Sequence, residues 1–217
     1  MISYRLVRSA RKTLAVQITP QGEVVVRAPK RLSQRRIDAF LEEKQGWIAT
    51  HQQEVLRRMN ARPKLVLAPG GSLPLLGRWY PVALWEKASA FFDGQRFFLP
   101  REETLRTPAL VSCYRELARA DLSRRVAALT GAGGAVAIGG AKGRWGSCSA
   151  KGELRFSWRL MAAPEAAVDY VAAHEVCHRR ELNHSPKFWA LVEQILPDYR
   201  ERQAMLKQPD ALALLEL

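Results

Sequence analysis

Three of the chain's four histidines fall within residues 174–184, in the stretch HEVCHRRELNH. His174 and His178 are four residues apart, so on a helix both imidazoles project from one face. Two imidazoles in that geometry suit two corners of a tetrahedral metal site. Glu175 is rotated by about 100° from His174, so it can exchange protons with a metal-activated water without being a ligand. The H-E-x-x-H spacing therefore predicts a site for metal-assisted hydrolysis.

A catalytic zinc ion needs a third protein ligand and one open position, and His184 is the remaining histidine nearby. The pattern predicts a helix of about 18 residues from Glu165. Asn183 tolerates the conformation that ends helices, and Pro186 follows soon after, so we expect the helix to break around Leu182–Asn183. The chain would then turn and bring His184 back to the metal. The competing interpretation is that these histidines lie on the surface, or in the core bonded to the backbone.

The segment GRWGSCS, residues 143–149, is the second candidate for function. Strand edges beside the cleft of a zinc hydrolase can hold an extended substrate by strand addition, and the glycines would allow close approach. An arginine here could bind an anionic group, and the serine or cysteine could donate hydrogen bonds. A structural hairpin with Trp145 in the core explains the segment equally well. The candidate substrate-binding residues are Arg144, Trp145, Gly146, Ser147 and Cys148.

The charge of the chain is uneven. Its formal net charge is +13, and residues 1–100 carry 17 basic against 7 acidic residues, while residues 101–217 carry 17 against 14. A basic module attracts anions such as nucleotides and nucleic acids, although arginine-rich composition alone accounts for it equally well. The first residues have no apolar core of signal-peptide length, and three cysteines without a C-x-x-C pair exclude a cysteine-only zinc cluster. We therefore expect a cytoplasmic protein without a membrane partner.

Short β-branched runs before residue 30 predict strands, and residues 32–61 predict one long helix that Gly46 could kink. A second long helix is expected over residues 107–131, with Gly131 as its stop. Residues 143–161 predict a hairpin before the histidine helix. We expect two regions, a basic β-rich region over residues 1–105 and a catalytic domain over residues 106–217.

The stretch RWGSCSAKGELRFSWRLMAAPEAAVDYVAAHEVCHRRELNHSPKFW and the tail PDYR resemble the YgjP-like metallopeptidase family. RSARKTLAVQI and VVVRAPKRLS resemble that family's N-terminal region, so the resemblance covers nearly the whole chain. It implies zinc bound by His174, His178 and His184, with Glu175 as general base, and kinship with SprT-like proteases. The expected fold is α+β, with a zincin-like metallopeptidase core. In it the histidine helix would pack on a small, mostly antiparallel sheet.

Four functions compete at this point. The favoured one is a zinc-dependent metallopeptidase acting on an extended peptide. A metal-dependent nucleotide pyrophosphatase on UTP-like substrates could use the same site, with Arg144 and the basic half binding phosphates. A nucleic-acid-associated protease is the third possibility. A structural zinc module is the fourth, and it is disfavoured because Glu175 stands beside three protein ligands rather than four.

Overall fold

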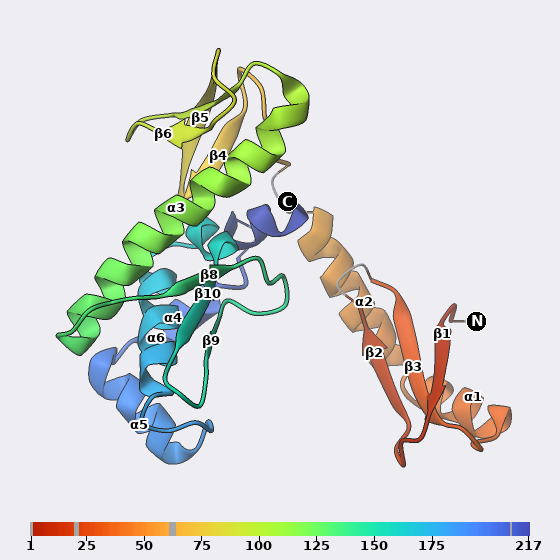
Figure 1. Cartoon of the computed structure of the whole chain (residues 1–217). Helices are drawn as coiled ribbons and strands as arrows, with labels where there is room; N and C mark the ends of the chain where they lie inside the picture. The colour runs from red at the N-terminus through yellow and green to blue at the C-terminus, as the bar shows by residue number, and fades with distance from the viewer. Residues whose placement is uncertain (1, 20–21, 61–63, 209) are drawn as a thin grey trace. The chain divides into compact units, whose positions relative to one another are not determined.

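The computed structural model describes residues 2–19, 22–60, 64–208 and 210–217 (Figure 1). The chain divides into two compact units, Met1–Arg62 and Pro63–Leu217, each with its own hydrophobic core. Within the described residues, six α-helices and three small sheets form a mixed α+β structure, which confirms the predicted class. No helix in this part of the chain is long and apolar enough to cross a membrane.

The first unit is a three-stranded sheet with helices on one face. Its strands are β1 (Arg5–Ser9), β2 (Ala15–Ile18) and β3 (Val24–Pro29), in the order β1-β3-β2. One face of the central strand packs against α1 (Gln34–Glu43) and α2 (Gln45–Asn60). The one long helix that the sequence predicts is therefore two helices. They meet at Lys44, whose φ of −92° and ψ of 4° leave the helical region two residues before the glycine expected to kink it.

The second unit begins with a four-stranded sheet that packs on a long helix. The strands are β4 (Ser72–Leu75), β5 (Arg78–Trp85), β6 (Phe91–Phe92) and β7 (Phe97–Pro100), in the order β4-β5-β7-β6. The helix is α3 (Glu103–Thr130), and it ends as predicted at Gly131, which takes the left-handed conformation with φ 66°. Residues 64–105 thus share a compact unit with the histidines. The predicted regions 1–105 and 106–217 divide the chain at a different place.

The tip of the β4–β5 hairpin reaches the start of the histidine helix. Leu76 and Gly77 both have positive φ, as a two-residue hairpin turn of the favoured hand requires. The Leu76 N–H donates to the Met161 carbonyl at 2.7 Å. A β-carbon on Gly77 would lie 2.9 Å from the α-carbon of Pro164, so only glycine fits this contact. The first sheet of this unit therefore contacts the chain directly before α4 (Glu165–Cys177).

The second sheet of this unit is small and has mixed pairing. It contains β8 (Ala137–Gly139), β9 (Gly146–Cys148) and β10 (Leu154–Ser157), in the order β8-β10-β9. The predicted hairpin is present, because β9 pairs antiparallel with β10. The expectation of a mostly antiparallel sheet is wrong here, since β8 pairs parallel with β10. The parallel edge strand β8 packs against the long helix α3.

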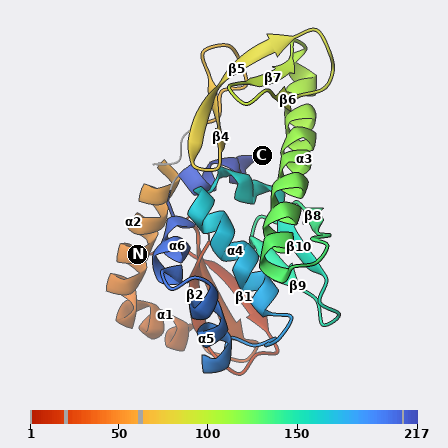
Figure 2. The ribbon, with the colours of Figure 1, turned by 90° about the vertical axis from the view of Figure 1, so that its left-hand side faces the viewer.

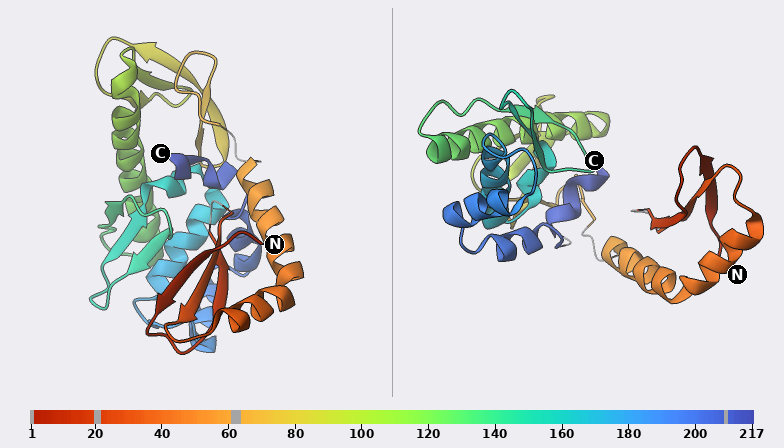
Figure 3. Two further views of the ribbon diagram at one scale, coloured as in Figure 1. Left: turned by 90° about the vertical axis from the view of Figure 1, so that its right-hand side faces the viewer. Right: turned by 90° about the horizontal axis from the view of Figure 1, so that it is seen from below.

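Helices cover the remainder of the second unit. The 3-10 helix η1 (Trp158–Ala162) leads into α4, which is followed by α5 (Pro186–Ile195), α6 (Tyr199–Met205) and η2 (Asp210–Glu216). Figure 2 shows α4 lying between α3 and α6, and both helices contact it. The left view of Figure 3 shows α3 extending from the second sheet to the β4–β7 sheet. α4 is therefore enclosed along most of its length, and seven apolar residues of this helix are buried.

The histidine helix ends earlier than the sequence predicts. α4 stops at Cys177 rather than continuing to Leu182–Asn183, and His178 is its C-cap. The amides of Arg179 and Arg180 each bond to the carbonyl three residues earlier, which tightens the chain into successive turns. The Glu181 carbonyl turns back towards the His178 ring, a direction that a continuing helix would not allow. The predicted break at Asn183 is therefore wrong by about one helical turn.

Candidate metal centre

The three predicted histidines lie together at the end of α4. His174 is in the last turn of the helix, His178 caps it, and His184 stands in the loop before α5. One ring nitrogen from each histidine can be chosen so that all three lie within 4.8 Å of one another. The Nε2 atoms of His174 and His184 are 3.0 Å apart. The third histidine thus returns to the first two from outside the helix, as the sequence predicts.

Hydrogen bonds on the outer side of two rings turn their Nε2 atoms towards the histidine cluster. His178 Nδ1 lies 3.0 Å from the Glu181 carbonyl. Because a carbonyl can only accept, Nδ1 is the nitrogen that carries the proton, and Nε2 of the neutral His178 ring has the lone pair. His174 Nδ1 lies 3.3 Å from the Tyr170 hydroxyl, one turn earlier on α4. Outer partners of this kind hold the tautomer and the orientation of a metal-binding imidazole. The Nε2 atoms of both rings are therefore presented to the centre of the cluster.

Aromatic side chains from α5 and α6 stack on and around the histidine rings. Phe188 stacks on the His178 ring, with ring centroids 4.4 Å apart. Trp189 stacks on His184 at 5.6 Å, and Tyr199 stacks in turn on Trp189 at 5.4 Å. The loop itself is fixed by Ser185, whose hydroxyl caps α5 by accepting from the Phe188 amide. The stacked side chains of Phe188 and Trp189 therefore restrict the orientation of the His178 and His184 rings.

Burial shifts the pKa values of His174 and Glu175 in opposite directions. Burial, followed by the nearby His178 and His184 charges, lowers the pKa of His174 to about 4. The imidazole is therefore neutral near pH 7, which is the form that binds metals. Glu175 is only 6% exposed, and this burial raises its pKa to about 7 although Arg144 opposes the change. A carboxyl group with a pKa near 7 is suited to both accepting and donating a proton.

The pKa of Glu175 leads to a prediction for the metal-free protein. The folded chain holds this proton more tightly than the unfolded chain, whose pKa is near 4.5. The resulting contribution to the free energy of unfolding is complete below about pH 4.5 and is lost as the pH rises through about 7. The loss amounts to at most about 3 kcal/mol. Urea unfolding of chelator-treated protein at about pH 5 and about pH 8 should show Glu175→Gln gaining stability over the wild type as pH rises. If the free energies of unfolding of Glu175→Gln and the wild type differed by the same amount at both pH values, the raised pKa of Glu175 would be contradicted.

Glu175 lies directly against the strand β9. A β-carbon on Gly146 would come within 2.6 Å of both Cγ and Oε1 of Glu175, closer than real β-carbon contacts. Gly146 does not have a positive φ, so its lack of a side chain matters here for space rather than for backbone conformation. The sequence prediction that this glycine allows close approach is consistent with the structure, but the group that approaches it here is Glu175.

The open edge of the second sheet runs past the same carboxylate. The Ser157 amide donates to the Trp145 carbonyl at 2.8 Å, and the Ser149 amide donates to the Glu153 carbonyl at 2.9 Å. Because hydrogen-bonded and non-hydrogen-bonded pairs alternate in an antiparallel ladder, Gly146 and Cys148 turn their backbone groups away from β10. β9 is an edge strand, so these groups face outward. The edge can therefore accept another extended chain.

The candidate substrate-binding residues are divided between the two faces of this sheet. Gly146 opposes Phe156 and lies on the α4 side, and Cys148 is on the same side because side chains alternate along a strand. Ser147 pairs with Arg155 and lies on the opposite face. Arg144 is close enough to Glu175 to influence its pKa. Trp145 is half-buried and packs at the margin of the core.

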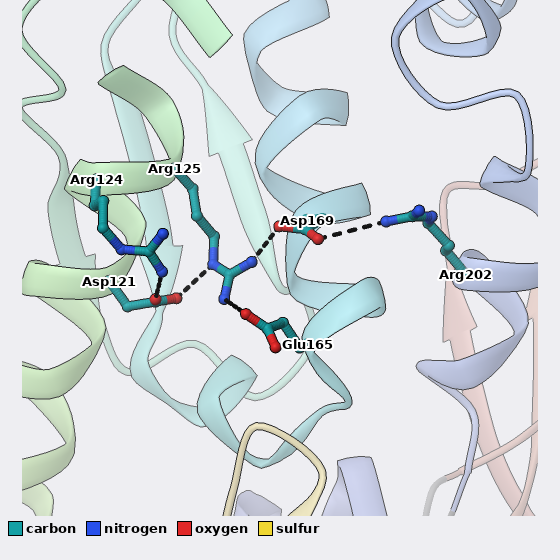
Figure 4. A network of polar contacts seen from close by, with 6 residues as sticks. All are labelled: Asp121, Arg124, Arg125, Glu165, Asp169 and Arg202. Carbon is teal, nitrogen blue, oxygen red and sulfur yellow. Dashed lines mark hydrogen bonds and ion pairs between the residues drawn. The ribbon is translucent and has the colours of Figure 1, made fainter. Parts of the chain in front are cut away.

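The buried guanidinium of Arg125 links α3 to α4 through ion pairs (Figure 4). Its side chain is 6% exposed, and it donates to Asp121 at 2.6 Å and to Glu165 at 3.1 Å, as well as to Asp169. Asp169 also receives Arg202 of α6 at 3.4 Å. Sequence reasoning did not identify this network, because its members are far apart in the chain and have no recognisable spacing. Tyr170 was also missed, although its position four residues before His174 was a readable signal.

Removing the guanidinium should measurably weaken the fold. Arg125→Met removes the buried cation that Asp121, Glu165 and Asp169 share, so we expect the free energy of unfolding to fall by about 3 kcal/mol. Urea denaturation of the metal-free protein would measure it. Arg124→Met is the matched control, because the neighbouring Arg124 also pairs with Asp121 but is largely exposed. Its loss should cost less than about 1 kcal/mol, and equal effects of the two substitutions would contradict the bracing role.

Three imidazoles and a buried carboxylate at the end of one helix, beside an open strand edge, define a candidate metal-dependent hydrolase. Residues 12–209 match the family model described as YgjP-like, metallopeptidase domain, so the chain belongs to the YgjP-like metallopeptidase family. This confirms the resemblance recognised in the sequence and indicates a metal-dependent peptidase that uses a divalent ion. Comparison with curated proteins and with solved structures found no significant match.

Proposed function

We propose that the protein is a zinc-dependent peptidase in which His174, His178 and His184 hold the ion and Glu175 is the general base. The observation that carries this proposal is the meeting of three imidazole nitrogens within 4.8 Å beside a buried carboxyl group. Imidazole nitrogens about 2.0–2.1 Å from a tetrahedral zinc ion lie about 3.4 Å apart, so the rings would shift by about 1 Å to bind the ion. Three protein ligands leave one position open, as a catalytic site requires. The zincin-like arrangement of helix and sheet belongs to the same proposal.

The residues of the chain supply orientation and proton transfer. A bound zinc ion would supply Lewis acidity, which activates water and polarises the scissile carbonyl. Glu175 would take a proton at its carboxylate from the attacking water and deliver it to the departing amine. Tyr170 and the Glu181 carbonyl would hold the imidazoles of His174 and His178 in the required orientation. The raised pKa of Glu175 supports this role, because a proton acceptor of about pKa 7 also releases the proton readily.

The substrate would bind as an added strand along β9. Backbone groups of Gly146 and Cys148 face the open edge and would bond to an extended peptide, which would then pass in front of Glu175. Arg144 would contact an anionic group of the substrate, since its charge is close enough to Glu175 to lower the pKa of that carboxyl group. Ser147 would only hold the strand in place, because its backbone groups face Arg155 of β10 and its side chain lies on the other face of the sheet. Trp145 would hold β9 in place, because its partly buried side chain packs against the hydrophobic core.

The decisive experiment compares substrate classes directly. The zinc-loaded protein is incubated in parallel with a peptide library and with nucleoside triphosphates, and products are identified by mass spectrometry. Cleavage of peptides alone, absent in Glu175→Gln, is the expected result. Hydrolysis of nucleotides without peptide cleavage would replace the peptidase by a nucleotide pyrophosphatase that uses the same residues.

The third ligand can be tested by metal content alone. His184→Ala removes one of three nitrogen donors and should lower zinc occupancy after dialysis at least about tenfold. Elemental analysis of the purified protein measures the effect, and His51→Ala is the matched control because His51 lies in α2, outside the cluster. Full zinc occupancy in His184→Ala would show that another residue completes the site.

The basic first unit favours nucleic acid as a second partner. Residues 1–62 contain 13 basic and 5 acidic residues, a net charge of +8 over less than a third of the chain. A surface of this charge would attract a phosphate backbone and release its counterions. Binding of the full chain to duplex DNA should then weaken steeply as salt rises. Affinity that does not depend on salt, or no binding at low salt, would rule out this docking role.

A further inference from the structure

Three side-chain N–H donors converge beside Gly140, at the edge of the second sheet opposite to β9. If Gly140 carried a β-carbon, that atom would lie 3.5 Å from Trp158 Nε1, 3.5 Å from Arg159 Nη1 and 3.7 Å from Arg115 Nη2. The donors come from η1 and α3, which are distant from each other in sequence. A space about the size of one atom is thus surrounded by donors and left vacant by the glycine.

The cations around this space have no carboxylate partner among the described residues. Arg159 is 4% exposed, and its hydrogen bonds go to two backbone carbonyls, those of Leu214 at 3.0 Å and Gly140 at 2.7 Å. Burial and the nearby charge of Arg115 lower the pKa of Arg159. A buried arginine is ordinarily paired with an acid, because an uncompensated charge is costly away from water. The pair of guanidiniums therefore leaves net positive charge at one point.

The chain around Gly140 adds more positive charge and no negative charge. The run of residues 122–152 has no acidic residue and five basic ones, of which Arg124 and Arg125 are paired with carboxylates. No ion pair in the described part of the chain includes the other three, which are Lys142, Arg144 and Lys151. Arg155 reaches the neighbouring Gly139, where a β-carbon would lie 3.8 Å from its Nη1. Arg155 is exposed, and none of the ion pairs found in the described residues includes it. Several donors and cations around a vacant space are the features of an anion site.

We propose that Trp158, Arg159 and Arg115 bind one oxygen of a tetrahedral oxyanion, a phosphate group, in the space beside Gly140, with the other oxygens outside that space. Guanidinium groups suit phosphate because their planar donors pair with two oxygens at once, and the indole N–H adds a neutral donor. The site is separate from the histidine cluster, because β8 and β9 are opposite edges of the same sheet. It would accept either free phosphate or the phosphate of a monoester, since the donors contact only the oxyanion.

Isothermal titration calorimetry at constant ionic strength tests the site directly. The probes are inorganic phosphate, glycerol phosphate and acetate, added to the full-length protein both zinc-loaded and chelator-treated. Saturable phosphate binding that is unaffected by zinc removal is expected, and glycerol phosphate that binds as well as phosphate would identify the monoester as an acceptable source. Weaker glycerol phosphate would identify free phosphate as the ligand. No saturable binding, equal binding of acetate, or binding that disappears with the zinc would overturn the proposal.

Matched substitutions separate a built site from diffuse positive charge. Gly140→Ala fills the vacant space at ordinary contact distances, and Arg115→Gln removes an exposed donor, so both should fold normally and weaken phosphate binding at least tenfold. The controls are Gly133→Ala, where a β-carbon meets nothing within 4 Å, and Arg119→Gln, one turn along α3 from Arg115. Unchanged affinity in the first pair, or equal weakening by Arg119→Gln, would contradict the proposal. Circular dichroism confirms that each variant is folded.

Discussion

Glu175→Gln is expected to lower peptide hydrolysis by about 10²–10⁴-fold, the usual contribution of a general acid–base group. Glutamine has nearly the same shape as glutamate, so it can occupy the space beside Gly146 but cannot take up a proton. The three imidazoles are untouched, and zinc content should therefore equal that of the wild type. Steady-state kinetics and elemental analysis of the same preparations measure the two quantities.

The control for this experiment is a glutamate outside the site. Glu193 is exposed on α5, and Glu193→Gln makes the same chemical change without altering the space around the histidines. We expect wild-type activity and wild-type zinc content from this variant. Full peptide hydrolysis by Glu175→Gln would remove Glu175 from the mechanism, whereas loss of zinc in that variant would make Glu175 a ligand rather than a base.

Gly146→Ala should inactivate the enzyme nearly as strongly, although it removes no functional group. The new methyl carbon would lie 2.6 Å from two atoms of Glu175, so either the carboxylate or the strand must move. A displacement of about 1 Å at a catalytic group is enough to cost about 100-fold in rate. The histidines are not displaced directly, and zinc content should remain close to that of the wild type.

A neighbouring glycine and a double-mutant cycle make this second prediction specific. Gly143→Ala is the matched control, because a β-carbon at that position meets nothing within 4 Å. The same clash should lower the free energy of unfolding of Gly146→Ala. This loss should disappear in a Glu175→Ala background, where the clashing atoms are absent. If alanine at 146 costs the same with and without the Glu175 side chain, the contact between the two residues is not the cause.

Much of the candidate centre could be predicted from sequence because its information is local. His174, Glu175 and His178 follow helical periodicity, and the four-residue step by itself places both rings on one face. His184 could be assigned because the helix had to end before it. The residue at which the helix ends could not be predicted, because the turns after Cys177 include a bond from the His178 side chain to the Glu181 carbonyl. Local propensity does not contain such a contact.

The features missed by sequence reasoning depend on contacts between distant segments. The role of Gly146 requires knowing that β9 packs against α4, 29 positions further along the chain. Arg125 meets Asp169 and Glu165 across an interface between two helices, and no spacing rule connects them. The break at Lys44 was placed at Gly46, because glycine is the usual signal for a kink. Helix content and strand positions were therefore easier to predict than the junctions between them.

The early end of α4 also has an electrostatic consequence. Aligned peptide dipoles give the last turn of a helix a partial negative charge, equivalent to about half an elementary charge. Because α4 stops at Cys177, both His174 and His178 lie in or directly after that turn, where the carbonyls of Val176 and Cys177 are bonded by amides that follow the helix. A helix that continued to Leu182 would have carried this negative end more than one turn away from the rings. The backbone of α4 would thus attract a divalent cation to the same place as its side chains.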